Sequence, residues 1–547
     1  MKATTKTTVT AFGLLSTISA SPVQRRDNTS MVHNFADIEP SAELRWTPCF
    51  DNFTCSMLEV PLDYTDLSVG NTVVAFIKAS SGNDSAEDVL INPGGPGGSG
   101  ANTVLSSSEA YMKNELGPGF NMVGFDARGV NNSGIALNCF PGNAVGELNF
   151  GAETLDRAID DSTRDSLYEQ WLLDRGWGQR CTAVQAEDKP NKYANTVAVA
   201  NDMLRYTELR AKSLGRPAEE SKLFYYGLSY GTGLGQTFAT LFPNRIGRMV
   251  LDGNLDSADY FGGQWHHNLY DTDEAAKGFY NYCFHAGPDR CPFYGNSSSP
   301  DEIEARFFKI FKHLEEYPAL IADPLLTSTP VLITWREIKT YFLQALYKGV
   351  ERFPALASIL NDLENGNATS LALSSVTLTQ DLPIPATADP YFMGQARTQI
   401  ACIDANGRFN LSTFEKFEDH VAFLRNQSFY GYNTWAAIAV SPCQKLDIRP
   451  PESQVFSGFA TANKTSAPIL FVGNILDPVT PLRNTHKMSS QFADSAVLTV
   501  NGTGHTSRSV PSECARQYLR TYFADGTLPP VGELCQQNEL PFMAEVA

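Results

Sequence analysis

The sequence predicts an α/β protein whose mostly parallel, doubly wound sheet is interrupted by a helical insertion. Three observations predict this class. Short apolar runs alternate with helical segments in the first half, aromatic-rich helical segments fill the middle, and two strand-like runs return near the end. At 547 residues the chain is long for one hydrophobic core, so a large domain with an insertion, or two domains, is expected.

Five apolar runs before residue 255 are typical of strands in length and composition. They are Asn71–Ser80, Asp88–Gly95, Phe120–Gly129, Lys222–Gly227 and Arg248–Asn254. Helix-like stretches lie between them, notably Asn195–Leu214 and Thr232–Phe242. Strands that alternate with helices favour a parallel sheet covered on both faces.

The middle of the chain changes character, with helical patterns such as Asp301–Tyr317 and Trp335–Val350. Strand-then-loop patterns return at Ala467–Pro481 and Ala496–Ser507. We therefore predict five segments: a signal peptide (1–20), an N-terminal segment with a candidate propeptide to Arg26 (21–45), the first part of the sheet domain (46–255), a helical cap (256–440), and the second part of the sheet domain with a disulfide-tied C-terminal extension (441–547).

The N-terminus has the pattern of a secretory signal peptide. Lys2 and Lys6 precede a mostly uncharged stretch, Val9–Ala20, that ends in small residues and predicts cleavage after Ala20. This stretch is too short and too polar for a spanning helix. Arg25–Arg26 is a candidate dibasic processing site. No later segment has the pattern of a membrane span or a lipid anchor, so we expect a soluble, secreted protein.

Ten cysteines, an even number, favour disulfides in an exported protein. A metal site is the alternative, but no CxxC pair occurs. Pairing neighbours in order closes modest loops, and we predict five such bridges, although the sequence leaves the connectivity open. The cysteines are Cys49, Cys55, Cys139, Cys181, Cys283, Cys291, Cys402, Cys443, Cys514 and Cys535.

Ten N-x-S/T sequences add to the evidence for export, because they are acceptors for N-linked glycans. The acceptors are Asn28, Asn52, Asn83, Asn131, Asn296, Asn367, Asn410, Asn426, Asn463 and Asn501. The net charge of −18 and a pI near 4.9 argue against nucleic acid or an anionic membrane as the partner. Solubility is the simpler explanation of this acidity.

A serine flanked by glycines is the strongest chemical signal. Gly227-Leu228-Ser229-Tyr230-Gly231 matches G-x-S-x-G at the point where a strand ends and a helix begins. Small residues at both ends allow a sharp turn that exposes the hydroxyl. The motif alone occurs by chance in long chains, and a serine needs a histidine to take its proton and a carboxylate to hold that histidine.

His505 is the best candidate base, because it lies in a glycine-flanked loop directly after a strand. Asp477 follows the preceding strand, and the order Ser229, Asp477, His505 is that of a doubly wound hydrolase. A turn-forming Asp-Pro is the alternative explanation of Asp477. The other histidines fit less well, and the adjacent His266–His267 pair suits a surface or packing role better than a metal site.

The oxyanion of an acyl-transfer reaction needs backbone N–H donors. Tyr230, the residue after the nucleophile, supplies one. The glycine-rich loop Ile91–Gly100 can supply the other, from Gly94 or Gly95, because glycines let amides approach an anion closely. A phosphate-binding loop is the alternative, but the lysine and the glycine spacing that it requires are absent.

The chain resembles the secreted microbial tripeptidyl aminopeptidase-like group of α/β-hydrolases, relatives of proline iminopeptidases. The matching motifs are "RWTPCFDNFTCSMLEVPLDY", "NPGGPGGSG", "VGFDARG", "GLSYGT", "LFPNRIGRMVLDG", "ACIDANG", "ILDPVTP" and "GTGHTS". The resemblance implies an α/β-hydrolase fold, a helical cap, a Ser229–Asp477–His505 triad and removal of short peptides or residues from free N-termini. "GVNNSG" after "DARG", with Asn131 in a sequon, departs from the family pattern.

Three functions stay open. A secreted serine exopeptidase is the leading hypothesis; it needs a carboxylate for the substrate's α-ammonium, and Asp256, Asp259 and Asp404 are the candidates. An esterase or lactonase would use the same residues on a small molecule. A catalytically silent binding protein is the third. We expect a peptide or small-molecule substrate, no cofactor, no metal and a monomer.

Overall fold

The computed structural model describes residues 31–543 except 152–153, 155–156, 186–188, 328, 377–390, 392 and 439–440. The predicted signal peptide, the Arg25–Arg26 pair and the acceptor Asn28 lie outside the described residues.

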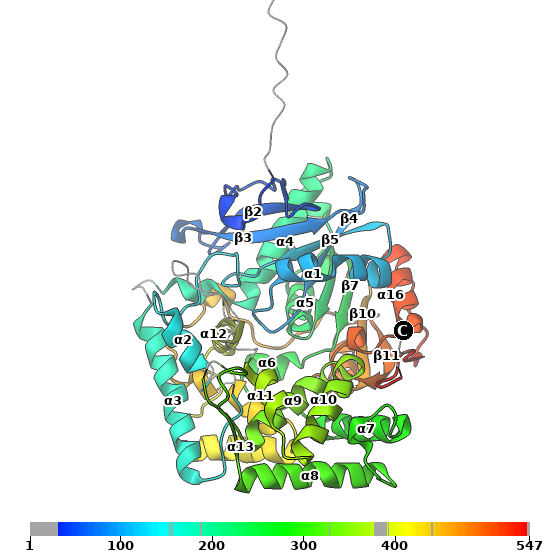
Figure 1. Cartoon of the computed structure of the whole chain (residues 1–547). Helices are drawn as coiled ribbons and strands as arrows, with labels where there is room; N and C mark the ends of the chain where they lie inside the picture. The colour runs from blue at the N-terminus through cyan, green and yellow to red at the C-terminus, as the bar shows by residue number, and fades with distance from the viewer. Residues whose placement is uncertain are drawn as a thin grey trace, which may run out of the picture.

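A ten-stranded sheet crosses the upper and right part of the molecule (Figure 1), in the order β1-β2-β3-β5-β4-β6-β7-β10-β11-β12. The pairs from β1 to β5 are antiparallel and every pair from β5 to β12 is parallel, which confirms the predicted mostly parallel sheet. The strands are β1 (Thr47–Cys49), β2 (Phe53–Pro61), β3 (Asn71–Ala79), β4 (Glu87–Asn92), β5 (Phe120–Phe125), β6 (Leu223–Leu228), β7 (Ile246–Asp252), β10 (Ile469–Leu476), β11 (Ala496–Thr503) and β12 (Leu534–Gln536).

Both faces of the sheet are buried, because side chains alternate between the two sides of each strand. In β4, Val89 and Ile91 pack with α1 (Gly100–Tyr111) and α16 (Glu513–Asp525), whereas Leu90 packs with α4 (Thr196–Ser213) and α5 (Tyr230–Leu241). The run of apolar residues in this strand is therefore the pattern of a doubly covered parallel sheet.

A mainly helical region fills the lower half of Figure 1 and lies between β7 and β10 in the chain. Its elements are α6 (Ser257–Gly262), α7 (Thr272–Ala286), α8 (Pro300–Glu316), β8 (Ala319–Ile321), β9 (Val331–Ile333), α9 (Trp335–Leu346), α10 (Gly349–Glu364), α11 (Thr369–Val376), α12 (Met393–Ala405), α13 (Phe414–Gln427) and α14 (Tyr432–Ile438). The remaining α-helices of the described residues are α2 (Ala144–Phe150), α3 (Arg164–Ala183) and α15 (Leu482–Ser489).

Local sequence explains why the long helices of this region form. The Ser299 side chain caps α8, Pro300 occupies its first turn, and Phe307, Phe311 and Leu314 form one buried stripe. Thr334 and Glu337 form a reciprocal capping box at the start of α9. These two helices begin within two residues of the helical patterns that the sequence shows.

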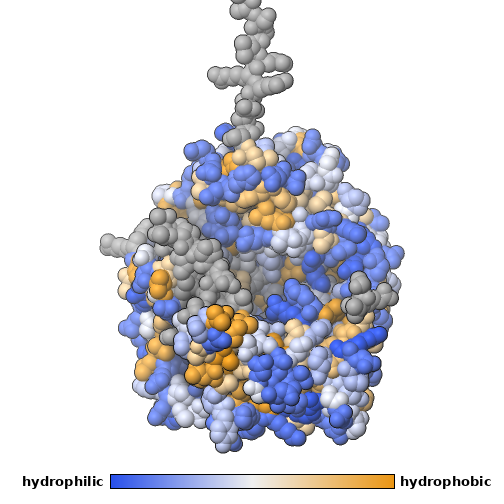
Figure 2. All heavy atoms as spheres, viewed as in Figure 1, coloured by the Kyte–Doolittle hydropathy of each residue, from blue (hydrophilic) through white to orange (hydrophobic). Residues whose placement is uncertain are grey.

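Five disulfides join the cysteines in sequence order: Cys49–Cys55, Cys139–Cys181, Cys283–Cys291, Cys402–Cys443 and Cys514–Cys535. Among the described residues, no helix combines the length and the apolar character that crossing a bilayer requires. Hydrophilic side chains cover most of the face in Figure 2, and hydrophobic ones gather mainly in its upper and lower parts.

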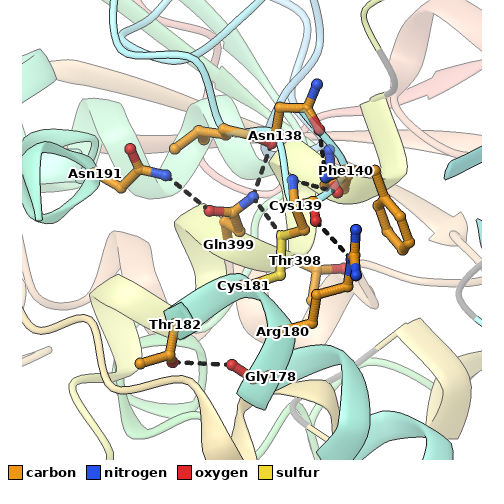
Figure 3. The surroundings of a disulfide bond; sticks show 12 residues. Asn138, Cys139, Phe140, Gly178, Arg180, Cys181, Thr182, Asn191, Thr398 and Gln399 are labelled. Carbon is orange, nitrogen blue, oxygen red and sulfur yellow. Dashed lines mark hydrogen bonds between the residues drawn. A yellow bond between two sulfur atoms is a disulfide. The ribbon is translucent and has the colours of Figure 1, made fainter. Parts of the chain in front are cut away.

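The Cys139–Cys181 disulfide ties the loop after β5 to α3, and α12 packs directly on it (Figure 3). The amide Nε2 of Gln399 donates to the carbonyl of Leu137 at 2.7 Å and contacts the Cys139 sulfur at 3.3 Å. Asn191 donates to the Gln399 carbonyl at 3.1 Å. One side chain of α12 thus joins three segments that are far apart in sequence.

Candidate active site

Ser229 lies in a strained turn between β6 and α5. Its φ of 55° and ψ of −123° are a conformation that residues other than glycine rarely adopt, and it is half-buried. The two flanking glycines are needed because the backbone of this turn packs closely against neighbouring carbonyl oxygens. A Cβ atom at Gly227 would lie 2.4 Å from the Gly231 carbonyl oxygen, and one at Gly231 would lie 2.7 Å from that of Asn92. The turn therefore presents a serine hydroxyl above the carboxyl ends of the strands.

His505 and Asp477, which follow β11 and β10, are brought into contact. His505 Nδ1 is 3.1 Å from each carboxylate oxygen of Asp477, and the acid is fully buried. The carboxylate also accepts main-chain N–H groups of Val479, Thr480 and Thr506 at 2.8–3.0 Å. Burial by itself would raise the pKa of Asp477, but His505 and these N–H groups outweigh it and hold the pKa below its ordinary value.

The end of β7 lies between the serine turn and the histidine loop. The Ser229 N–H donates to the Asp252 carbonyl at 3.0 Å. At the next residue, a Cβ atom on Gly253 would lie 3.4 Å from His505 Cε1 and 2.8 Å from a carbon of Thr506. Gly253 has a positive φ of 71°, so a glycine suits both its conformation and this close approach. Ser229 and His505 therefore approach two adjacent residues, Asp252 and Gly253.

The glycine-rich loop after β4 packs against the serine turn. A Cβ atom at Gly94 would lie 2.8 Å from the Ser229 Cβ and 3.2 Å from the Tyr230 nitrogen. The N–H of Gly94 itself donates to the Asn92 side chain at 3.0 Å, so it is already used. Of the two predicted oxyanion donors in this loop, Gly94 therefore already has an acceptor for its N–H group.

The helical region reaches this site in two places. The ring of Tyr347, just after α9, meets the His505 ring edge-on at 5.0 Å, and its carbonyl accepts the His505 N–H at 2.9 Å. Thr272 of α7 donates to the Pro478 carbonyl at 2.6 Å, which holds the loop that carries Asp477. The helical region thus contacts both His505 and the loop that carries Asp477.

The three carboxylates predicted to bind an α-ammonium are buried and have protein partners. Asp256 pairs with His267 Nδ1 at 2.6 Å and with the Lys487 ammonium. Asp259 accepts the N–H groups of His266 and His267 at 3.0 and 2.8 Å. The structure does not place an open carboxylate at any of these positions.

Asp404 connects to the serine turn through other residues. It accepts the N–H and hydroxyl of Thr196 at 2.9 and 2.6 Å and the Tyr260 hydroxyl at 2.9 Å. Thr196 also contacts the Tyr230 hydroxyl at 2.6 Å. Burial raises the pKa of Asp404 to about 6. This carboxylate joins α12, α4 and the start of α5.

The His266–His267 pair divides between two environments. His266 Nε2 lies 2.9 Å from His420 Nδ1, and burial lowers their pKa values to about 4 and about 3. His267 pairs with Asp256, as described above. Among the described residues, one group of potential metal ligands lies close together: Cys514, Glu533 and Cys535. The two cysteines of this group form a disulfide bond with each other.

Three residues near the predicted triad were not identified from the sequence. Thr480 contacts His505 Nδ1 at 3.0 Å, Tyr347 packs on its ring, and Asp252 lies at the end of β7. The Asp-Pro-x-Thr spacing after a strand could have suggested Thr480. Tyr347 lies 158 positions before His505, so only the tertiary structure shows the contact.

Eight of the nine described sequon asparagines are exposed on the surface; the exception is Asn131. Asn131 is half-buried, has a φ of 44°, and donates to the Ser99 hydroxyl at 3.2 Å. Its side chain is turned toward the start of α1, at the point where the sequence departs from the family pattern.

A doubly wound sheet with a strained serine at one strand end, and a His–Asp pair at the ends of the following strands, defines an α/β-hydrolase. Two family models agree: one described as "alpha/beta hydrolase fold" matches residues 89–290, and one described as "TAP-like protein" matches residues 428–535. The chain is similar to the TAP-like α/β-hydrolases, and the predicted resemblance to this family and the prediction of a serine hydrolase are confirmed.

Three relatives match nearly the whole chain. Serine protease Hip1 of Mycobacterium tuberculosis is 27% identical over 516 residues, 90% of this chain and 91% of the relative. The tripeptidyl aminopeptidase of Streptomyces coelicolor is 24% identical over 518 residues, 91% of this chain and 87% of the relative. Carboxylesterase B of Mycobacterium tuberculosis is 26% identical over 503 residues, 88% of this chain and 86% of the relative.

Proposed function

We propose that the chain is a secreted serine exopeptidase that removes residues or short peptides from free N-termini. The observation that carries the proposal is that Ser229 and His505 flank the end of β7 while His505 is held by the buried Asp477. A hydroxyl, an imidazole and a carboxylate in this order are the parts of an acyl-transfer site.

The proposed mechanism assigns a defined role to each of these residues. Ser229 Oγ attacks the substrate carbonyl while His505 Nε2 takes its proton. Asp477 keeps Nδ1 protonated, so Nε2 is free to accept. The N–H groups of Tyr230 and Gly95 bind the oxyanion, and His505 then protonates the leaving amine. Water repeats the sequence on the acyl-enzyme and releases the acid.

The exopeptidase part of the proposal is supported by the named activity of the Streptomyces relative. Export is supported by the predicted signal peptide, by five disulfides and by the exposed sequons. Recognition of the α-ammonium by Asp256, Asp259 or Asp404 stays a prediction. Each of these carboxylates is bonded to protein groups in the structure, so a substrate would have to share or replace those partners.

A matched pair of substrates tests the proposal. The purified protein is given one peptide amide with a free N-terminus and the same peptide N-acetylated, and the fragments are identified by mass. We expect short N-terminal fragments from the free peptide and no turnover of the blocked one. Equal rates would contradict the exopeptidase assignment. Labelling with a fluorophosphonate and mapping of the adduct to Ser229 tests the nucleophile, and absence of labelling would favour a silent binding protein.

An esterase is the second candidate, because Carboxylesterase B covers most of the chain at nearly the same identity as the protease. The same triad cleaves esters and amides, so the helical region decides the substrate. The ratio of kcat/KM on short acyl esters to that on aminoacyl amides separates the two. Turnover of esters alone would support the esterase.

A further inference from the structure

Asp252 is a buried acid to which the proposed mechanism gives no role. It is the last residue of β7 and lies between β6, which leads to Ser229, and β10, which leads to Asp477. Its side chain has no exposed surface. A carboxylate without access to solvent is costly to bury unless its oxygens are hydrogen-bonded, so its partners indicate why the position is acidic.

Among the described residues, the hydrogen-bond donors to the Asp252 carboxylate belong to the segments that carry Ser229 and His505. One oxygen accepts the N–H of Ser507 at 2.8 Å. The other accepts the Ser507 hydroxyl at 2.6 Å and the Tyr226 hydroxyl at 2.9 Å. Ser507 is two residues after His505, and Tyr226 is three residues before Ser229.

The main chain of Asp252 completes the connection. Its carbonyl accepts the Ser229 N–H at 3.0 Å, and the N–H of the following Gly253 donates to the Val472 carbonyl in β10 at 3.0 Å. One residue therefore bonds to the serine turn, the histidine loop and, through its neighbour, the strand before Asp477. Asp477, and not Asp252, is the acid that bonds to His505 Nδ1.

We propose that Asp252 is a positioning residue, which sets the distance between Ser229 and His505 by bonding to both of their loops. The proposal rests on the proposed function. Proton transfer needs the two reacting atoms within hydrogen-bond reach, and a displacement of about 1 Å costs about 100-fold in rate. The three side-chain hydrogen bonds limit movement of the histidine loop relative to β6.

Hydrogen bonding, and not charge, is the feature of Asp252 that the proposal requires. Burial raises the pKa of this carboxyl, and the bonds from Ser507 and Tyr226 oppose the rise. An asparagine in this place accepts the Ser507 N–H with its oxygen and donates its amide to the two hydroxyls, which can both accept. Asp252→Asn is therefore the conservative replacement, and Asp252→Ala removes all three bonds.

The experiment compares kcat per active site, counted by fluorophosphonate titration, so that loss of folded protein does not count as loss of rate. For Asp252→Ala we expect kcat to fall about 100-fold with KM nearly unchanged. For Asp252→Asn we expect kcat within about threefold of the wild type. Ser507→Ala, which removes one bond of the three, is the variant to use where Asp252→Ala does not fold, and its kcat should fall between these values.

Asp88→Ala is the matched control. Asp88 is also a buried strand carboxylate, with Asn121 and Tyr206 as donors at 2.7 Å, but it lies near the start of β4, away from the site. We expect it to lower stability and to leave kcat per active site unchanged. Wild-type kcat in Asp252→Ala or in Ser507→Ala, or an equal loss in Asp88→Ala, would overturn the positioning role. Full activity of Ser229→Ala would overturn the proposed function instead.

Discussion

His505 Nδ1 lies 3.1 Å from both carboxylate oxygens of Asp477, whose side chain is completely buried. Three main-chain N–H groups hold the same carboxylate, so it is fixed before any substrate arrives. A carboxylate at Nδ1 favours the tautomer that leaves Nε2 free to accept a proton. Because its pKa lies below the ordinary value, Asp477 is ionised at the pH values at which a neutral histidine can accept a proton.

Asp477→Asn is therefore expected to lower kcat by about 10⁴-fold, because an amide holds the ring but favours the wrong tautomer and does not stabilise the imidazolium. Steady-state rates on a free-N-terminal peptide measure the effect. Asp271→Asn is the control, since the Asp271 carboxylate precedes α7 and pairs with Arg483 at 3.4 Å and not with His505, and it should stay near the wild type. A tenfold loss or less in Asp477→Asn would argue that another residue orients His505.

Gly94→Ala tests the contact between the glycine-rich loop and the serine turn. The new methyl group would lie 2.8 Å from the Ser229 Cβ, so one of the two loops must move. We expect fluorophosphonate labelling and kcat to fall by about 100-fold or more, as in the loss of an oxyanion donor. Gly82→Ala is the matched control, because Gly82 also has a positive φ but no neighbouring atom within 4 Å. It should cost about 1 kcal/mol of stability and no activity. Equal effects of the two variants would point to backbone strain alone.

The pH dependence of stability should reflect Asp174, a fully buried carboxyl in α3. Burial raises its pKa from 3.8 to about 7, against hydrogen bonds from Ser441 and Gln170. At a pH between these two pKa values, Asp174 is protonated in the folded state and ionised in the unfolded state. This contribution to stability is present below the unfolded pKa and is lost as the pH rises through the folded pKa, by up to about 1.4 kcal/mol per unit.

Urea unfolding at pH 4.5 and pH 7 measures this effect. Asp174→Asn, which mimics the protonated acid, should be close to the wild type at pH 4.5 and more stable than the wild type at pH 7. A difference in unfolding free energy that does not change with pH would show that Asp174 is ionised in the folded state throughout.

The sequence predicted those elements whose signal is local. The strands that lead to Ser229, Asp477 and His505 are apolar runs followed by loop residues, and the order of the three residues follows from that pattern. The strands β1, β2 and β12 were not predicted; β1 and β12 have only three residues each, whereas β2 is nine residues long. Asp252, Thr480 and Tyr347 were missed for another reason. Each contacts a loop that is distant from it in sequence, and hydrophobic periodicity does not predict such a contact.

Asn131 should be the described sequon asparagine that carries no glycan. Its amide donates to Ser99 and is half-buried, whereas the other eight described acceptors are exposed. Glycopeptide mass mapping of the secreted protein, with and without deglycosylation in H₂¹⁸O, reads each acceptor separately. Asn83, exposed in a loop before β4, serves as the positive reference. A glycan on Asn131 would require the loop after β5 to take another conformation before or after folding.

Ser229 and His505 act as one unit in the proposed mechanism, which a double variant can test. Ser229→Ala alone should lower kcat by about 10⁶-fold, and His505→Ala by a similar factor, leaving about 10³–10⁴-fold over the uncatalysed rate from the oxyanion site and binding. The double variant should lose little more than either single one, because the second change removes a group that no longer has a partner. Melting curves should stay close to the wild type for Ser229→Ala, since a small half-buried side chain contributes within about 1 kcal/mol. Additive losses would mean that the two residues serve separate steps, and wild-type turnover by folded Ser229→Ala would refute the mechanism.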